Sequence, residues 1–290
     1  MKSNDDIQKL MTLNFKGGVG KTTLTFLLAR YFSENQKKKV ILFDLDPQMN
    51  LTYLLLFDGR DSFTAEKIAR WYYEYEHGNY NIVKAIKVFY EGKNWNSFPV
   101  KKMFIKINEN LYFIPSIIQL YWFDLYNKRL KKIDEFITSL VEKILQEEQF
   151  STSEYFLFDS PPAITYLSLS TLNFCNKIII PMVPHVFAAR GLNLILSTMR
   201  ILEISEDKEL FILLNKAREY KNYLSNDNKK ILDQSRKIIT NWSKEWKGKI
   251  SICSEYIKED SDIAKISQSK RIPDGMKNIF ENISKEIGFL

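Results

Sequence analysis

The sequence of 290 residues has few of the side chains that build cross-linked or metal-rich proteins: two cysteines and two histidines. Cys175 and Cys253 give neither a disulfide framework nor the spacing of a metal site, so we expect two buried or half-buried thiols in a reducing cytoplasm. His77 and His185 have no partner at ligand spacing and are expected to be structural. Chemistry that depends on a cysteine-bound cluster is therefore excluded.

Long apolar runs and linkers are also missing. No stretch reaches the roughly 18 apolar residues of a membrane-spanning helix, and MKSNDDIQKLMTLNF at the start lacks the apolar core of a signal peptide. No repeat, low-complexity tract or Pro/Gly/Ser linker divides the chain, so we expect a single domain over residues 1–290. The net charge of +7 permits nucleic acid or an anionic membrane as a partner and demonstrates neither.

Short apolar runs alternate with amphipathic stretches along the chain. The runs typical of strands are 10–15, 39–46, 154–160, 176–184 and 209–216, and the helical stretches include 21–36, 127–147 and 190–204. Buried strands that alternate with helices predict an α/β fold, doubly wound, with a mostly parallel sheet and helices on both faces. Ligands of such sheets lie at the carboxyl ends of the strands, where the candidate groups below all fall.

The segment GGVGKT (17–22) follows the first expected strand and opens a helix, which is the context of a phosphate-binding loop. Glycines let backbone N–H groups approach phosphate oxygens, and the helix N-terminus adds the positive end of its dipole. Lys21 is expected to reach the β- and γ-phosphates, and the Thr22 hydroxyl to ligate Mg²⁺. The expected nucleotide-binding residues are Gly17, Gly18, Val19, Gly20, Lys21, Thr22 and Thr23.

An extra lysine, Lys16, precedes these glycines, and Phe15 stands where the usual pattern has its first glycine. The run KGGVGKTT resembles the deviant phosphate loop of the ParA/MinD family of ATPases, above all the small ParA ATPases of plasmid and chromosome partition. In that family the early lysine contacts the phosphates of the nucleotide held by the partner subunit. The resemblance therefore implies a homodimer formed on ATP binding, with Lys16 in that catalytic role; the residues alone fit a solvated flank equally well.

Two carboxylate segments strengthen the resemblance. FDLDPQMN (43–50) resembles the family's first switch, which implies that Asp46 orients the attacking water and that Asp44 lies in the outer shell of Mg²⁺. For Asp44, a cap on the following turn is an equal alternative. YFLFDSPPA (155–163) resembles the Walker B strand and second switch, which implies that Asp159 holds Mg²⁺ together with Thr22.

The base pocket is matched less well. In ILLNKAR (212–218), Asn215 occupies the position that reads the adenine edge in relatives. Lys258 stands where the family usually carries a proline that shapes the base pocket. ATP as the nucleotide is therefore implied by the resemblance.

The C-terminal third, from Lys216 onward, is basic and carries no base-reading motif, which suits sequence-independent contact with DNA phosphates. The candidate DNA-binding residues are Lys244, Lys247, Lys249, Lys270 and Arg271. The resemblance implies a partition ATPase whose ATP-bound dimer binds double-stranded DNA on the nucleoid, until a ParB-like centromere-binding partner stimulates hydrolysis. A merely solvated basic face is the alternative for any single cluster.

A MinD-like membrane-associated ATPase, or a ParA-like positioner of another cargo, is the alternative function. Residues 272–290 form one apolar helical face, but Lys277 and Lys285 are matched by Glu281 and Glu286, so the face lacks a basic rim for lipid. We therefore expect this helix to pack in the core and a membrane partner to be absent. Residues 58–110 carry no recognisable motif and are expected to form a family-variable excursion with its own small core, a surface for a partner being the alternative.

Overall fold

The apolar runs of the sequence form an eight-stranded sheet with the order β10-β7-β6-β1-β5-β2-β4-β3. The computed structural model describes residues 6–57, 64–92, 94–126, 135–204, 207–220, 223–259 and 272–289. The strands of the sheet are β1 (Gln8–Thr12), β2 (Val40–Asp44), β3 (Ile105–Lys106), β4 (Leu111–Ile114), β5 (Tyr155–Asp159), β6 (Lys177–Met182), β7 (Glu209–Ala217) and β10 (Lys249–Lys258). Strand β3 pairs antiparallel with β4 and the other pairs are parallel, which confirms the expected α/β fold.

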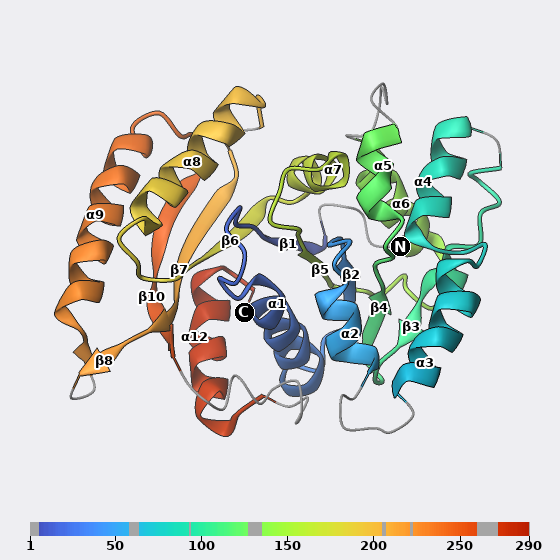
Figure 1. Cartoon of the computed structure of the whole chain (residues 1–290), viewed down its shortest axis with the longest axis horizontal. Helices are drawn as coiled ribbons and strands as arrows, with labels where there is room; N and C mark the ends of the chain where they lie inside the picture. The colour runs from blue at the N-terminus through green and yellow to red at the C-terminus, as the bar shows by residue number, and fades with distance from the viewer. Residues whose placement is uncertain are drawn as a thin grey trace.

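Helices cover both faces of this sheet (Figure 1). They are α1 (Lys21–Arg30), α2 (Asn50–Leu56), α3 (Thr64–Trp71), α4 (Ile82–Glu91), α5 (Leu120–Tyr126), α6 (Phe136–Gln146), α7 (Tyr166–Phe174), α8 (Ala188–Ile201), α9 (Asn226–Trp242) and α12 (Lys277–Glu286). Helices α1, α2 and α12 contribute to one apolar core, and α4, α6, α7, α8 and α9 to the other. Shorter elements are η1 (Tyr31–Asn35), η2 (Tyr72–Glu76), η3 (Val100–Met103), η5 (Asp274–Met276) and the hairpin of β8 (Glu219–Tyr220) and β9 (Tyr223–Leu224).

The central strands β1, β2 and β5 end at the same level of the sheet, and this register places the polar side chains of the site. Every residue of β2 and β5 is buried, which explains why both read as continuous apolar runs. In the parallel pairing Asp159 lies beside Thr12 of β1 and beside Asp44 of β2. Thr12, Asp44 and Asp159 are thereby brought to one edge of the sheet, at the carboxyl ends of the strands, where the sequence predicts the two aspartates.

The C-terminal helix packs in the core. Phe280 and Ile283 of α12 are fully buried, and Ile287 and Phe289 beyond it are nearly so. The Tyr155 hydroxyl donates to the Phe289 carbonyl at 2.7 Å, and the Lys177 ammonium donates to the Ile287 carbonyl. The expected packing of this apolar face is confirmed. Within the described ranges, no helix is both long and apolar enough to cross a membrane.

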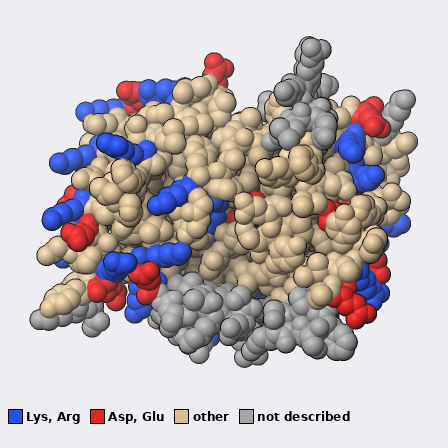
Figure 2. All heavy atoms as spheres, in the orientation of Figure 1, with Lys and Arg blue, Asp and Glu red and all other residues tan. Residues whose placement is uncertain are grey.

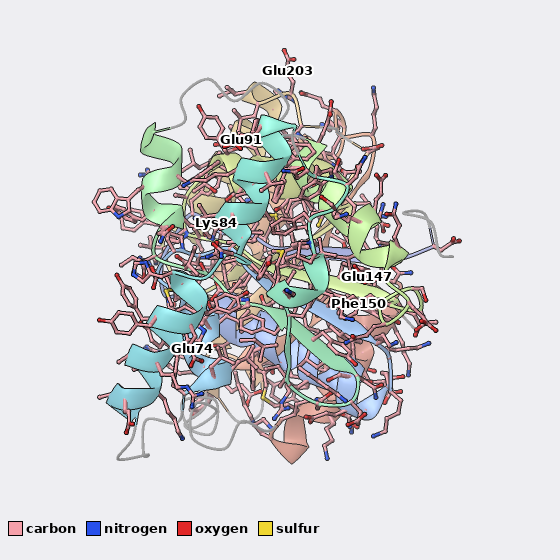
Figure 3. The ribbon with its side chains drawn as sticks, turned by 90° about the vertical axis from the view of Figure 1, so that its right-hand side faces the viewer. Glu74, Lys84, Glu91, Glu147, Phe150 and Glu203 are labelled. Atoms are coloured by element: carbon pink, nitrogen blue, oxygen red, sulfur yellow. The ribbon has the colours of Figure 1, made fainter. Side chains whose placement is uncertain are left out.

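The region without a motif does not form a core of its own, contrary to expectation. Elements α3, η2, α4 and η3 surround one end of the sheet, and Figure 3 looks onto this side, with Lys84 and Glu91 on α4. Ile86 of α4 and Met103 of η3 are fully buried in the same cluster as Phe156 of β5. The reason is that α4 and η3 pack directly against the helices and strands of the sheet, so their apolar side chains extend the main core.

Candidate nucleotide-binding site

The loop between β1 and α1 has the backbone shape that phosphate binding needs. Gly18 and Gly20 have φ angles of 73° and 93°, in the left-handed region that favours glycine. The base of the loop is tied to β6, since the Asn14 amide donates to the Pro181 carbonyl at 2.8 Å and accepts from the Lys16 N–H at 2.9 Å. Helix α1 begins at Lys21, so its free N-terminal N–H groups face the loop.

Two lysines of the loop differ in their surroundings. Lys21 is 7% exposed, and its ammonium lies 3.5 Å from the Lys16 carbonyl. Burial lowers the pKa of Lys21, and the nearby carboxylates of Asp159 and Asp46 oppose that shift. A buried ammonium flanked by carboxylates at a helix N-terminus is placed to meet an anionic ligand. Lys16, in contrast, is exposed beside the loop.

Asp159 is a buried carboxylate beside the start of α1. It is fully buried and hydrogen-bonds Thr22, and its Oδ1 accepts from the Thr25 hydroxyl at 3.5 Å. Its Oδ2 has no hydrogen-bond partner. Burial raises the pKa of Asp159 well above the ordinary value, and the neighbouring Asp44 carboxylate raises it further. An unsatisfied buried oxygen beside a threonine hydroxyl fits a hard cation such as Mg²⁺, because such ions prefer oxygen ligands.

Asp44 has both of its oxygens engaged within the protein. Its Oδ1 accepts from the Asp46 N–H at 3.0 Å, and its Oδ2 accepts from the Thr52 N–H at 2.8 Å and the Thr52 hydroxyl at 2.7 Å. Burial raises the pKa of Asp44 to about 7. Asp44 therefore caps the turn that follows β2 and fixes α2; a place in the outer shell of Mg²⁺ stays a prediction.

Asp46 lies between this cap and the loop. It is 4% exposed, and its Oδ1 accepts from the Gln48 N–H at 2.9 Å. Burial raises the pKa of Asp46, and the Gln48 N–H and the Lys21 ammonium lower it. Asp46 and Lys21 shift each other's pKa, so the Asp46 carboxylate lies within the site. That Asp46 orients the attacking water stays a prediction.

Asn215 holds the phosphate loop. Its Nδ2 donates to the Val19 carbonyl at 2.8 Å, and its Oδ1 accepts from the Lys216 N–H at 3.0 Å. A Cβ atom at Gly20 would lie 2.2 Å from this Nδ2, so only glycine allows the contact. Both the Nδ2 and the Oδ1 of Asn215 are therefore hydrogen-bonded within the protein. That Asn215 recognises the adenine base stays a prediction.

Two contacts at the site are not predicted by the sequence. The Lys216 ammonium donates to the Gly18 carbonyl at 3.0 Å, and the Ser160 hydroxyl donates to the Thr12 carbonyl at 2.6 Å. The sequence places Lys216 in the basic C-terminal third, and its position directly after Asn215 is the one signal for a contact with the loop. Lys216 also lines a pocket of about 560 Å³ beside the loop, together with Lys16, His185, Arg218 and Lys230.

The described candidate DNA-binding residues, Lys244, Lys247 and Lys249, lie away from the loop. Lys244, Lys247 and Lys249 are exposed, and Lys249 opens β10 opposite Glu209, at the amino ends of the strands. Lys270 and Arg271 lie outside the described residues. Figure 2 shows lysine and arginine gathered over α8, α9 and the β10 side, at the left, with acidic residues among them. The structure therefore does not bring the described members of this group to the nucleotide site.

A glycine loop between β1 and α1, with carboxylates at the ends of β2 and β5 of a parallel sheet, defines a phosphate-loop nucleotide-binding protein. Residues 7–212 match the family model described as an AAA domain, so the chain belongs to this family. Its relatives in the family include proteins of the ParA type.

Two curated relatives and one solved structure illustrate the likeness. The chromosome-partitioning ATPase Soj of Treponema pallidum is 30% identical over 66% of this chain and 63% of its own length. The maintenance of carboxysome distribution protein A of Gloeothece citriformis is 27% identical over 69% of this chain and 65% of its own length. A Cyanothece McdA variant in complex with ATP has the same fold, with a TM-score of 0.71 at 18% identity over 98% of this chain and 97% of that chain. The aligned segment thus spans somewhat less than two thirds of the two curated relatives.

Proposed function

We propose that the protein is a Mg·ATP-dependent partition ATPase of the ParA type. The proposal rests on the buried Oδ2 of Asp159, which has no hydrogen-bond partner and lies beside Thr22 and Lys21. These residues adjoin a glycine loop in which Gly18 and Gly20 have left-handed φ angles. The loop N–H groups and Lys21 would hold the phosphates, and Thr22 and Asp159 would hold Mg²⁺. The ATP-bound relative of the same fold supports the choice of nucleotide.

The charges of the site support a bound cation. Asp44, Asp46 and Asp159 are buried near the Lys21 ammonium, the one buried cation at this site among the described residues, and burial raises the pKa of each of the three carboxyls. Buried carboxylates in excess over cations are unfavourable unless a further positive charge offsets them. A Mg²⁺ ion held by Thr22 and Asp159 would supply that charge and would offset negative charge on the phosphate oxygens. Asp46 would position the attacking water, and slow hydrolysis would keep the ATP state until a partner protein stimulates it.

The proposed partners follow from the ParA resemblance. ATP would join two copies, with the exposed Lys16 of each copy reaching the nucleotide of the other. The dimer would bind double-stranded DNA without sequence preference, in the cytoplasm on the nucleoid, and a ParB-like centromere-binding protein would release it. The basic side of the molecule over α8, α9 and β10 supports contact with DNA phosphates (Figure 2).

Positioning of a cargo other than DNA is a second candidate. The resemblance to a carboxysome-distribution protein favours it, because that relative matches as much of the chain as the chromosome-partitioning one. A MinD-like membrane anchor is less well supported, because Phe280 and Ile283 of α12 are buried in the core.

Binding to random-sequence duplex DNA tests the proposal, measured without nucleotide, with ADP and with ATP, each at two salt concentrations. Binding only with ATP, weakened strongly by salt, supports the partition ATPase. Binding that is equal in all nucleotide states contradicts the switch. ATP-dependent binding to anionic liposomes in place of DNA makes this a membrane-positioning protein.

A further inference from the structure

Two successive residues of β7 donate hydrogen bonds to two successive carbonyls of the phosphate loop, and we call this pair of hydrogen bonds the grip. The Asn215 amide donates to the Val19 carbonyl at 2.8 Å, and the Lys216 ammonium donates to the Gly18 carbonyl at 3.0 Å. The residues are almost 200 positions from the loop in sequence, so the contact is a product of the fold alone. Both donors come from the carboxyl end of one strand.

A regular strand could not provide this grip, because neighbouring side chains of a strand point to opposite faces of the sheet. Lys216 has a φ angle of 53°, in the left-handed region. Of the described non-glycine residues with positive φ, Lys216 is the one that lies inside a strand. The left-handed turn of the backbone breaks the alternation and lets both side chains reach the loop. Such a conformation is unfavourable for lysine and persists where surrounding contacts determine it, which is common at functional sites.

The grip orients the N–H groups of the loop. In a planar trans peptide the C=O and the N–H point in opposite directions. A donor on the Gly18 carbonyl therefore turns the Val19 N–H away from β7, and a donor on the Val19 carbonyl does the same for the Gly20 N–H. These are the groups that cradle the phosphates in such a loop.

We propose that Lys216 is a positioning residue that, with Asn215, holds the phosphate loop ready for nucleotide by fixing its carbonyls. The inference rests on the proposed nucleotide binding and adds to it a residue outside the sequence motifs. The alternative is that Lys216 is one of several cations around the pocket and acts on a ligand directly. Lys230 of α9 lines the same pocket and is exposed, 3.8 Å from Asp227, so it serves as the matched control.

Nucleotide affinity is measured by calorimetry with ADP and with the ATP analogue AMPPNP, for wild type, Lys216→Met, Lys216→Arg and Lys230→Met. Loss of one charged hydrogen bond predicts that Lys216→Met raises the Kd about three- to tenfold. The rise should be equal for both nucleotides, because the held peptides serve phosphates common to both. Lys216→Arg should restore most of the affinity, and Lys230→Met should bind as wild type.

A second measurement needs no nucleotide. Hydrogen–deuterium exchange of the peptide that covers residues 14–23 should be faster in Lys216→Met than in wild type and unchanged in Lys230→Met. Lys216→Gly keeps the left-handed backbone without strain, so it should fold at least as stably and still bind weakly. A stably folded Lys216→Gly variant with weak nucleotide binding would show that the lost affinity comes from the missing hydrogen bond and not from unfolding.

The outcomes decide between the alternatives. Unchanged affinity and exchange in Lys216→Met overturn the inference. Loss for AMPPNP alone also overturns it, because Lys216 would then act on the γ-phosphate instead of on the loop. If wild type itself binds neither nucleotide, the proposed function fails, and faster loop exchange in Lys216→Met still supports the grip.

Discussion

Asp159 is held in a position that is unfavourable for folding alone. It is fully buried, one of its oxygens has no partner, and burial together with Asp44 raises its pKa. The same features make the residue suited to a cation. If Asp159 holds Mg²⁺ as proposed, the stability of the nucleotide-free protein and its affinity for Mg·ATP are opposed at this position.

Asp159→Asn is expected to stabilise the nucleotide-free protein by about 1 kcal/mol, because the amide removes a desolvated negative charge from beside Asp44. The variant should also lose the rise in Tm that Mg·ATP gives to wild type. Thermal unfolding with and without Mg·ATP checks both effects. Asp233→Asn, on the exposed face of α9, is the control and should change neither. A normal response of Asp159→Asn to Mg·ATP would exclude Asp159 as a ligand.

Asp46→Ala is expected to separate binding from hydrolysis. The carboxylate lies near Lys21 but is not needed to hold the loop, so ATP binding and dimer formation should persist. Turnover should fall by about a hundredfold or more, the usual cost of losing a group that positions or activates a water. Phosphate release and sedimentation in ATP measure the two properties. A variant that fails to dimerise would show that Asp46 supports the switch segment structurally.

At the scale of elements, the sequence predicted the parts that depend on local pattern. The strand expected at 209–216 is β7, Glu209–Ala217, and the apolar run 154–160 is β5, Tyr155–Asp159. Such strands are buried on both faces of the sheet, so nearly all of their residues are apolar and the strand can be recognised from the sequence as a continuous apolar run. The contact of Lys216 with Gly18 could not be predicted, because it depends on a left-handed residue and on the placing of β7 beside the loop. The shared core of α4 was missed for a similar reason: periodicity shows an apolar face but not its partner.

Helix α12 provides a prediction at this scale. Phe280 is fully buried against α1 and the sheet, so Phe280→Ala should lower the free energy of unfolding by about 3–5 kcal/mol. Chemical denaturation measures the loss. Glu281→Gln, which removes an exposed ion pair with Lys285, is the control and should cost at most about 1 kcal/mol. A small loss for Phe280→Ala, with wild type binding to liposomes, would instead favour a detachable lipid anchor.

At the scale of the whole molecule, the carboxyl ends of the strands gather the loop, the carboxylates and the pocket at one edge, while Lys249 lies at the other. If the first edge is where two copies meet, DNA contact at the second leaves the nucleotide undisturbed. The arrangement therefore suits a protein in which nucleotide state controls DNA binding through assembly.

Lys16→Gln tests that arrangement. Lys16 is exposed and its side chain is not needed to shape the loop, whose base is held through Asn14, so the variant should bind ATP with near-normal affinity. It should remain a monomer at ATP concentrations that convert wild type into a dimer, and should lose ATP-dependent DNA binding. Light scattering after gel filtration in Mg·ATP gives the mass. A dimeric Lys16→Gln would show that Lys16 makes no essential contact across an interface.

The register of the central strands sets how the chain tolerates changes in length. Asp159 lies beside both Thr12 and Asp44, and side chains alternate along a strand. Deletion of one residue within β5 would put Ser160 at the level where Asp159 now lies beside Thr12 and Asp44, and would turn the Asp159 carboxylate to the opposite face of the sheet. Insertions and deletions are therefore expected in natural variants around α3 and α4, at the end of the sheet, and not between Val40 and Asp46 or within β5. Divergence of this chain in length should be confined to that end of the sheet, while the edge that carries the phosphate loop should change only by substitution.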